Sequence, residues 1–142
     1  MTPTPCFPAP LWRRLAAALY DGLLLAALWM VAAMLDALVR GIAGLPYNVH
    51  VLRAWLFLVG FAFCGWFWTH GGQTLGMRAW RLHLRRSDGQ PVGWVTALSR
   101  YAFAWLAWLP AGAGVLLSAI DPQQRSWHDR LSGTAVILLP KP

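Results

Sequence analysis

A long apolar run near the start of the chain constrains the fold more than any other feature. Between Leu15 and Val39 only Asp21 and Asp36 are charged, and no proline interrupts the run. As a helix that rises about 1.5 Å per residue, the run would extend about 37 Å, which is enough to cross the hydrocarbon core of a bilayer with some tilt. The run therefore predicts a transmembrane helix over about residues 12–39.

The composition agrees with a membrane protein and not with a soluble domain. The chain is 58% apolar and 12% charged, whereas soluble domains carry about a quarter charged residues. The net charge is +7. Because the arginines flank apolar runs and form no stripe on a polar domain, we expect them to meet the anionic headgroups of a lipid bilayer and not a nucleic acid.

Two further apolar stretches complete the predicted membrane domain. Residues 54–68 carry no charge and predict a second transmembrane helix over about residues 52–69. Residues 97–120 predict a third helical segment over about residues 95–120, broken at its centre by Pro110 and the glycines after it. This segment is either one kinked span or a re-entrant pair of half-helices. The predicted fold class is all-α: a helical integral membrane protein with two clear transmembrane helices and a third, Pro/Gly-broken or re-entrant, helical segment.

The remaining parts of the chain are polar or short. Residues 1–10 are rich in proline and predict a disordered tail. Residues 71–94 form the most polar segment, and within it residues 77–86 alternate between apolar and basic side chains. That alternation is typical of a strand, although a short amphipathic helix on the membrane surface is the competing interpretation. Residues 135–139 are apolar but too short to span.

The arginines also predict an orientation. Seven of them flank the first two spans on one side: Arg13, Arg14, Arg78, Arg81, Arg85, Arg86 and Arg100. Only Arg40 and Arg53 lie between the two spans. Because cytoplasmic loops carry an excess of basic residues, we expect the N-terminus and the basic segment 71–94 to be cytoplasmic. The basic residues after residue 121 would prefer the same side, which favours a re-entrant third segment.

Asp21 is the residue that the hydrocarbon would penalise most. It lies two turns inside the first predicted helix, at a depth of roughly 10 Å. Arg14 shares its helix face, but its side chain leans toward the helix start, so the two cannot simply pair. Asp21 could bind a proton or a cation. Alternatively it forms a structural ion pair with a neighbouring segment, for example with Arg100.

Five other residues are candidates for function. Gln73 and Thr74 could form a ligand loop or only a backbone turn. Arg78 and the arginines that follow it could grip a phosphorylated ligand or headgroups, or could be solvated determinants of topology. Asp129 with His128 could form a second acidic site or a proton relay, or could cap or contact the C-terminal tail.

Nothing in the sequence indicates a catalytic centre. No Gly-x-Ser-x-Gly, His-Glu-x-x-His or phosphate-loop motif occurs, and the chain has no glutamate. The four histidines lack the paired spacing of metal ligands. We therefore expect no enzyme activity, no metal site and no cofactor.

Several short motifs, taken in their order along the chain, resemble the RDD family of small bacterial membrane proteins, which is named for one arginine and two aspartates. These motifs are Arg14 with Asp21, then Gly72-Gln73-Thr74-Leu75-Gly76 with Arg78 and Asp88-Gly89, then Asp121-Pro122, His128-Asp129 and Gly133-Thr134. Met77 stands where family members often carry lysine. The resemblance covers residues 11–139 and implies one membrane domain in a multi-pass protein of the bacterial inner membrane. It also implies a poorly defined activity, for which transport is the usual suggestion.

Two functions from different classes follow. The first is transport of an ion or small solute, by a homo-oligomer or with a partner membrane protein, because three short segments enclose little volume. The second is a non-transporting scaffold or accessory subunit that recruits a partner through its basic cytoplasmic face. A polar cavity containing Asp21 would favour the first, and a dry, closed bundle would favour the second.

Overall fold

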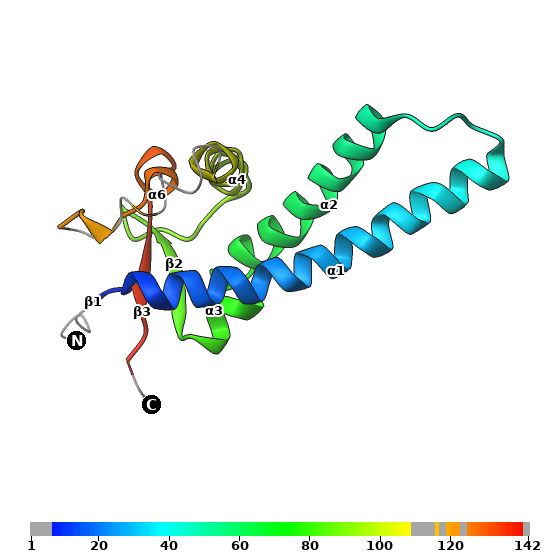
Figure 1. Ribbon diagram of the computed structural model, residues 1–142. Coiled ribbons are helices and arrows are strands. Elements are labelled where there is room, and N and C mark those ends of the chain that lie inside the picture. The colour runs from blue at the N-terminus through cyan, green and yellow to red at the C-terminus, as the bar shows by residue number, and fades with distance from the viewer. Residues whose placement is uncertain (1–6, 109–115, 117–118, 123–124, 141–142) are drawn as a thin grey trace.

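Two long helices project from one end of the molecule, and the shorter elements gather around the other end (Figure 1). The long helices are α1 (Leu11–Ala43) and α2 (Val49–Thr69), and both are long and apolar enough to cross a membrane. We call these two helices the hairpin. The computed structural model describes residues 7–108, 116, 119–122 and 125–140.

Local capping and tryptophan hydrogen bonds fix the hairpin. Gly44 ends α1 in the left-handed conformation (φ 63°), and Asn48 begins α2 by accepting hydrogen bonds from two backbone N–H groups. The Trp29 indole donates to the Leu56 carbonyl at 2.9 Å, and Trp55 donates from α2 to the Ala32 carbonyl of α1 at 3.1 Å. The two predicted apolar helices are therefore confirmed, and both are a few residues longer than predicted.

The shorter elements form a second part of the molecule, which we call the head. Its helices are α3 (Leu75–Ala79), α4 (Trp94–Trp108) and α6 (Trp127–Leu131), and its strands are β1 (Phe7–Pro8), β2 (Leu82–Arg86) and β3 (Thr134–Leu138). The strands form an antiparallel sheet in the order β1-β3-β2, with Leu84 opposite Val136. Leu82 and Leu84 of β2, Ala97 and Tyr101 of α4 and Ala17 of α1 belong to one buried apolar core.

The sheet adds to the predicted fold, which remains mostly helical. Both interpretations of residues 77–86 hold in part, because α3 ends at Ala79 and β2 begins at Leu82. The short apolar run after residue 134 is the central strand of the sheet. The predicted disordered tail is wrong for its last residues: β1 pairs with β3, and the Ala9 N–H donates to the Val136 carbonyl at 3.3 Å. An unpaired edge of the central strand would leave its buried backbone groups unsatisfied.

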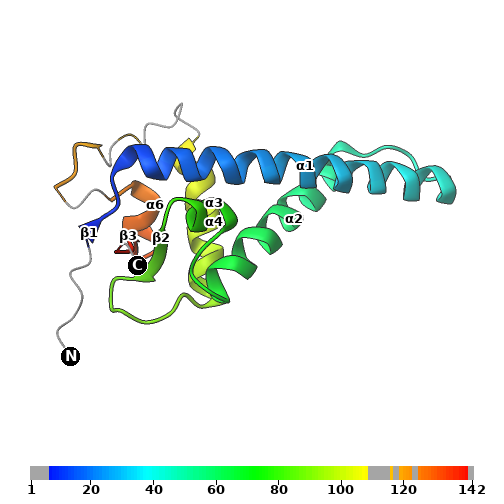
Figure 2. The ribbon, with the colours of Figure 1, turned by 90° about the horizontal axis from the view of Figure 1, so that it is seen from below.

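The third apolar stretch begins as predicted and does not run alongside α1. Figure 1 shows α4 end-on and Figure 2 shows it from the side, so that α4 crosses α1 steeply. The predicted break at Pro110 lies outside the described residues. Asp121 lies in the head, where it accepts a hydrogen bond from Arg130 of α6. Because β3 pairs with β1 and β2, residues 134–138 lie at the same end of the molecule as residues 7–8.

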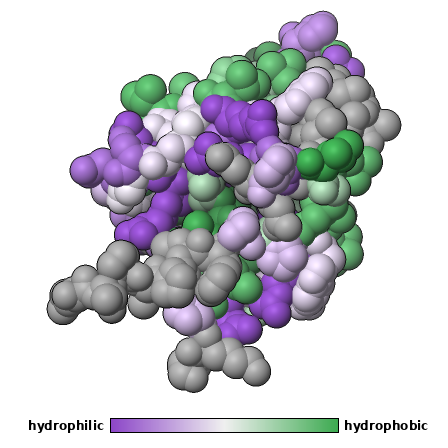
Figure 3. Space-filling view, turned by 90° about the vertical axis from the view of Figure 1, so that its left-hand side faces the viewer, coloured by the Kyte–Doolittle hydropathy of each residue, from purple (hydrophilic) through white to green (hydrophobic). Residues whose placement is uncertain are grey.

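The head and the hairpin differ in surface character. Large apolar side chains are exposed along the hairpin, for example Leu23, Met30 and Ile42. Viewed from the side of the head, hydrophilic side chains spread over the face, and hydrophobic residues are concentrated along its upper and right-hand edges (Figure 3). This division is what a lipid-exposed hairpin joined to a water-exposed head requires.

Candidate functional site

Asp129 is the most completely buried charged residue among those described, with 0% exposure. It lies in the first turn of α6, where its Oδ2 accepts hydrogen bonds from the backbone N–H of Ser126 at 3.1 Å and from the Ser126 hydroxyl at 2.8 Å. The spacing Ser126-x-x-Asp129 is that of a capping box, in which the side chain satisfies a backbone donor that the helix leaves free. The carboxylate is therefore positioned by its own helix before any distant residue reaches it.

Two arginines from distant helices converge on this carboxylate. Arg14 of α1 donates from Nη2 to Oδ2 of Asp129 and, at 3.1 Å, to the Ser126 hydroxyl. Arg100 of α4 donates from Nη1 to Oδ1 of Asp129 and, at 2.7 Å, to the hydroxyl of Thr134. Together with His128, these residues form what we call the charge cluster. The cluster joins α1, α4, α6 and the first residue of β3.

The electrostatics of the charge cluster favour fixed protonation states. Burial alone would raise the pKa of the Asp129 carboxyl, but the Arg100 and Arg14 guanidinium groups outweigh it and hold that pKa far below its usual range. Burial, reinforced by Arg100, lowers the pKa of His128 to about 3. Near neutral pH Asp129 is therefore ionised and His128 neutral. This arrangement favours the capping interpretation of the His128–Asp129 pair over the proton relay.

Arg100 has a second contact that matters for its position. Its guanidinium carbon lies 5.3 Å from the ring centroid of Trp68 in α2, in a cation–π arrangement. Its Nε is buried and has no hydrogen-bond partner among the described residues. The Trp68 ring therefore stabilises the part of the guanidinium that Asp129 and Thr134 do not bind.

Asp21 forms a separate site with α3 and not with an arginine. Its Oδ1 accepts a hydrogen bond from the Gly76 N–H at 2.8 Å, and its Oδ2 accepts one from the Thr74 hydroxyl. Thr74 is the N-cap of α3, and its hydroxyl also accepts from the Met77 N–H at 3.3 Å. The alternative in which Asp21 pairs with Arg100 is wrong, because Arg100 binds Asp129 and Asp21 binds the start of α3. Arg14 binds Asp129 and Ser126 instead, as described above.

Asp21 lies at the junction between the head and the hairpin. One turn before it, Ala17 is 3% exposed under the head, whereas Leu19 and Leu23 on the outer face are 68% and 66% exposed. The head therefore packs against one face of the first turns of α1, and the depth predicted for Asp21 was counted from a helix start that lies beside the head.

Close packing at Gly76 holds α3 against α1. A Cβ atom at Gly76 would lie 2.9 Å from the Asp21 carboxylate and closer still to the Ala17 carbonyl oxygen. No larger side chain fits without moving α3 away from α1. Gln73 contributes at the same turn, because its side-chain N–H donates to the Leu82 carbonyl at 2.6 Å. Gln73 and Thr74 thus bind protein groups, as in the backbone-turn interpretation.

The predicted site residues thus fall into three groups: the charge cluster, the contact between Asp21 and α3, and an exposed arginine. Arg14, Arg100, His128 and Asp129 meet in the charge cluster; Asp21 and Thr74 meet at α3, with Gln73 beside them; Arg78 is exposed and separate. Sequence reasoning missed Ser126 and Gly76. The Ser-x-x-Asp spacing could have identified Ser126 as a cap, whereas no local pattern indicates the close approach at Gly76.

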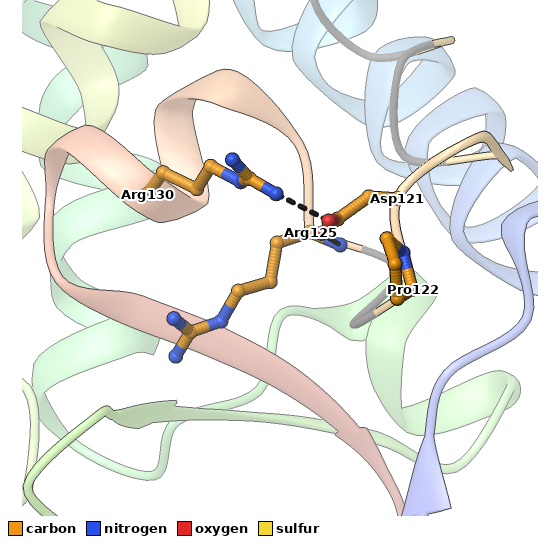
Figure 4. A pocket seen from close by; sticks show the side chains of 4 residues that line it. All are labelled: Asp121, Pro122, Arg125 and Arg130. Carbon is orange, nitrogen blue, oxygen red and sulfur yellow. Dashed lines mark hydrogen bonds and ion pairs between the residues drawn. The ribbon is translucent and has the colours of Figure 1, made fainter.

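Two cavities lie elsewhere. The larger, about 490 Å³, is an open hollow lined by Asp121, Pro122, Arg125 and Arg130 (Figure 4). Here Arg130 pairs with Asp121, and the Arg125 guanidinium turns away to donate to the Ser87 hydroxyl at 2.7 Å. The smaller, about 310 Å³, lies between the end of α2, β2 and the following turn. Neither is lined by Asp21 or Asp129, and within the described ranges no three metal-binding side chains gather.

Comparison with known proteins gives one match. A family model described as the RDD family matches residues 8–133, which is nearly the whole chain. The matched range includes Arg14, Asp21 and Asp129. No curated protein and no solved structure matches the chain significantly.

Proposed function

The chain belongs to the RDD family, and from that premise we propose that it is a multi-pass protein of the bacterial inner membrane that acts as a non-transporting scaffold or accessory subunit. The observation that carries this proposal is that Asp21 and Asp129 are both bound by groups of the protein itself. Asp129 is held by two arginines, and both oxygens of Asp21 bind the start of α3. Carboxylates bound in this way stabilise a fold and are poorly suited to exchange ions.

The exposed surface supports a role in association. The hairpin presents apolar side chains to lipid or to another membrane helix, and the head presents basic side chains such as Arg78 and Arg85. We propose that the bilayer with its anionic headgroups and a second membrane subunit, either another copy or a different protein, are the partners. Catalysis and nucleic-acid binding are not part of this proposal.

Transport remains the second candidate, and one observation favours it. Asp21 is a carboxylate beside an apolar span, and among the described residues it forms no ion pair. Carboxylates in such positions can bind protons or cations in membrane proteins. In that case we propose that a second copy completes the pathway, because the two cavities described above are lined by residues other than Asp21.

Ion flux and stability, measured together, separate the two functions. In proteoliposomes we expect the wild type to move no more protons or sodium than empty vesicles. In detergent, Asp21→Asn should lower the free energy of unfolding by about 1–3 kcal/mol, because the amide cannot accept both hydrogen bonds.

Asp36→Asn is the matched control for the flux measurement, since Asp36 lies on the same helix and pairs with Arg40 at its far end. Flux in the wild type and in Asp36→Asn that is abolished by Asp21→Asn, with unchanged thermal stability, would establish transport instead.

The proposed orientation is tested by cysteine labelling. With Cys6 and Cys64 replaced by alanine, a cysteine at Tyr47, in the connection between α1 and α2, should react with an impermeant thiol reagent in intact cells. A cysteine at Gln90 should not react, because its turn belongs to the cytoplasmic head. Labelling of the Gln90 position alone would reverse the orientation.

A further inference from the structure

The smaller cavity is not used by the charge cluster or by Asp21. It is lined by the end of α2, the Gly71–Gly72 turn, β2 and the turn that follows β2, and its volume is about 310 Å³. Its polar side chains come from Thr69, His83, Arg85 and Gln90. This volume accommodates a phosphate group with the carbon atoms attached to it.

The lining of this cavity carries uncompensated positive charge. His83 and Arg85 are two residues apart on β2 and therefore lie on the same face of the strand. No carboxylate lines the cavity, and Arg85 forms no ion pair with any described residue. Asp88, the acidic residue of the next turn, pairs with Arg86 at 2.9 Å. A bound anion would supply the charge that the fold does not.

His83 is held in place beside that charge. Its Nδ1 lies 3.2 Å from the Gly72 carbonyl oxygen, and Gly72 has the positive φ of 65° that lets the turn pass under the ring. A Cβ at Gly72 would lie 2.6 Å from Nδ1. Burial and the neighbouring Arg85 lower the pKa of His83. A negative ligand beside the ring would raise the pKa of His83 again. Protonated His83 would then be a second cationic hydrogen-bond donor beside Arg85.

The position of the cavity indicates the source of the anion. At the end of α2, Trp66 and Trp94 are 56% and 48% exposed, and the ring of His70 stacks on Trp66 with centroids 4.0 Å apart. Exposed tryptophans at the end of an apolar helix are typical of the membrane–water interface. The cavity lies at the same level along α2, since Trp68 and Thr69 of the last turn belong to its lining. The phosphates of lipid headgroups occupy the same level of a bilayer.

We propose that this cavity binds the phosphate of an anionic phospholipid, with the Arg85 guanidinium as the principal ligand and the His83 and Gln90 side chains as additional donors. Guanidinium and phosphate form charge-assisted hydrogen bonds, which are stronger than hydrogen bonds between neutral groups. A soluble phosphate ester offers the same chemistry, and the level of the aromatic rings favours the lipid. The site does not depend on whether the protein transports, and it rests on the proposed association with anionic headgroups, for which it names a specific place in the fold.

Native mass spectrometry of the full-length protein in a neutral detergent tests the site. The probes are dioleoyl phosphatidylglycerol, dioleoyl phosphatidylcholine and inorganic phosphate. We expect the wild type to bind phosphatidylglycerol about tenfold more tightly than phosphatidylcholine, and Arg85→Gln to remove about a factor of ten of the affinity for phosphatidylglycerol. His83→Gln should weaken binding less than Arg85→Gln.

Arg86→Gln is the matched control. It removes the same charge from the neighbouring residue, and the Arg86 side chain already pairs with Asp88. It should change the affinity for phosphatidylglycerol by less than about twofold. Equal losses in Arg85→Gln and Arg86→Gln, or equal binding of the two lipids by the wild type, would overturn the proposal. Displacement of phosphatidylglycerol by micromolar inorganic phosphate would overturn the lipid as the source of the anion.

Discussion

The substitution Asp129→Asn is expected to lower the free energy of unfolding by about 3–5 kcal/mol, because it removes the buried carboxylate that binds both the Arg14 and the Arg100 guanidinium groups. Arg14 and Arg100 are 9% and 5% exposed, so water cannot replace the lost carboxylate without opening the head. The substitution also weakens the cap of α6. Thermal or denaturant unfolding of the purified protein in detergent, together with the folded yield from membranes, measures the effect.

Two further variants make this result specific. Asp88→Asn removes an equal charge from an exposed pair with Arg86 and should cost less than about 1 kcal/mol. Arg100→Gln should resemble Asp129→Asn, and the two together should be less than additive, because both remove one contact. Wild-type stability of Asp129→Asn would show that the charge cluster does not hold the head together.

Acidification is expected to destabilise the protein through His128, by about 2 kcal/mol between pH 7 and pH 5. The pKa of His128 is lowered in the folded protein to about 3 from its ordinary value of 6.5. Between these two values the unfolded chain binds a proton that the folded chain does not, so the free energy of unfolding falls as the pH falls. The lowered pKa of Asp129 adds a loss of the same sign below about pH 4.

His128→Gln is expected to flatten this pH dependence between pH 7 and pH 5, because glutamine takes up no proton in either state. His50→Gln is the control, since His50 is exposed at the start of α2. Unfolding midpoints in detergent at several pH values measure the slope. An unchanged slope in His128→Gln would mean that another group titrates on unfolding.

The parts of the fold that follow from local pattern could be predicted from the sequence. The apolar runs specify α1 and α2 because a helix in lipid satisfies its own backbone and needs only length and apolar side chains. The strand β2 follows from its alternation of apolar and basic residues. By contrast, β3 is a five-residue apolar segment whose role depends on β1 and β2, and no local signal indicates that pairing.

The sequence indicates candidate residues for the site, but it does not indicate which of them contact one another. The sequence singles out Arg14, Asp21 and Asp129, and it offers Arg100 as one possible partner of Asp21. That pairing would require the first and third helices to start at one level. The head instead takes up the first turns of α1 and turns α4 across it, so that Arg100 meets Asp129, which is 29 residues later in the chain.

The contact between Arg14 and Asp129 has a consequence for biosynthesis. The two residues are 115 positions apart, so at about 5–20 residues per second a ribosome needs roughly 6–23 s to deliver the carboxylate after the guanidinium. In the second half of that interval the hairpin has been synthesised, but Asp129 and the central strand β3 have not. A nascent chain that stops before α6 therefore lacks the carboxylate that binds Arg14 and leaves the edges of β1 and β2 without the strand that joins them.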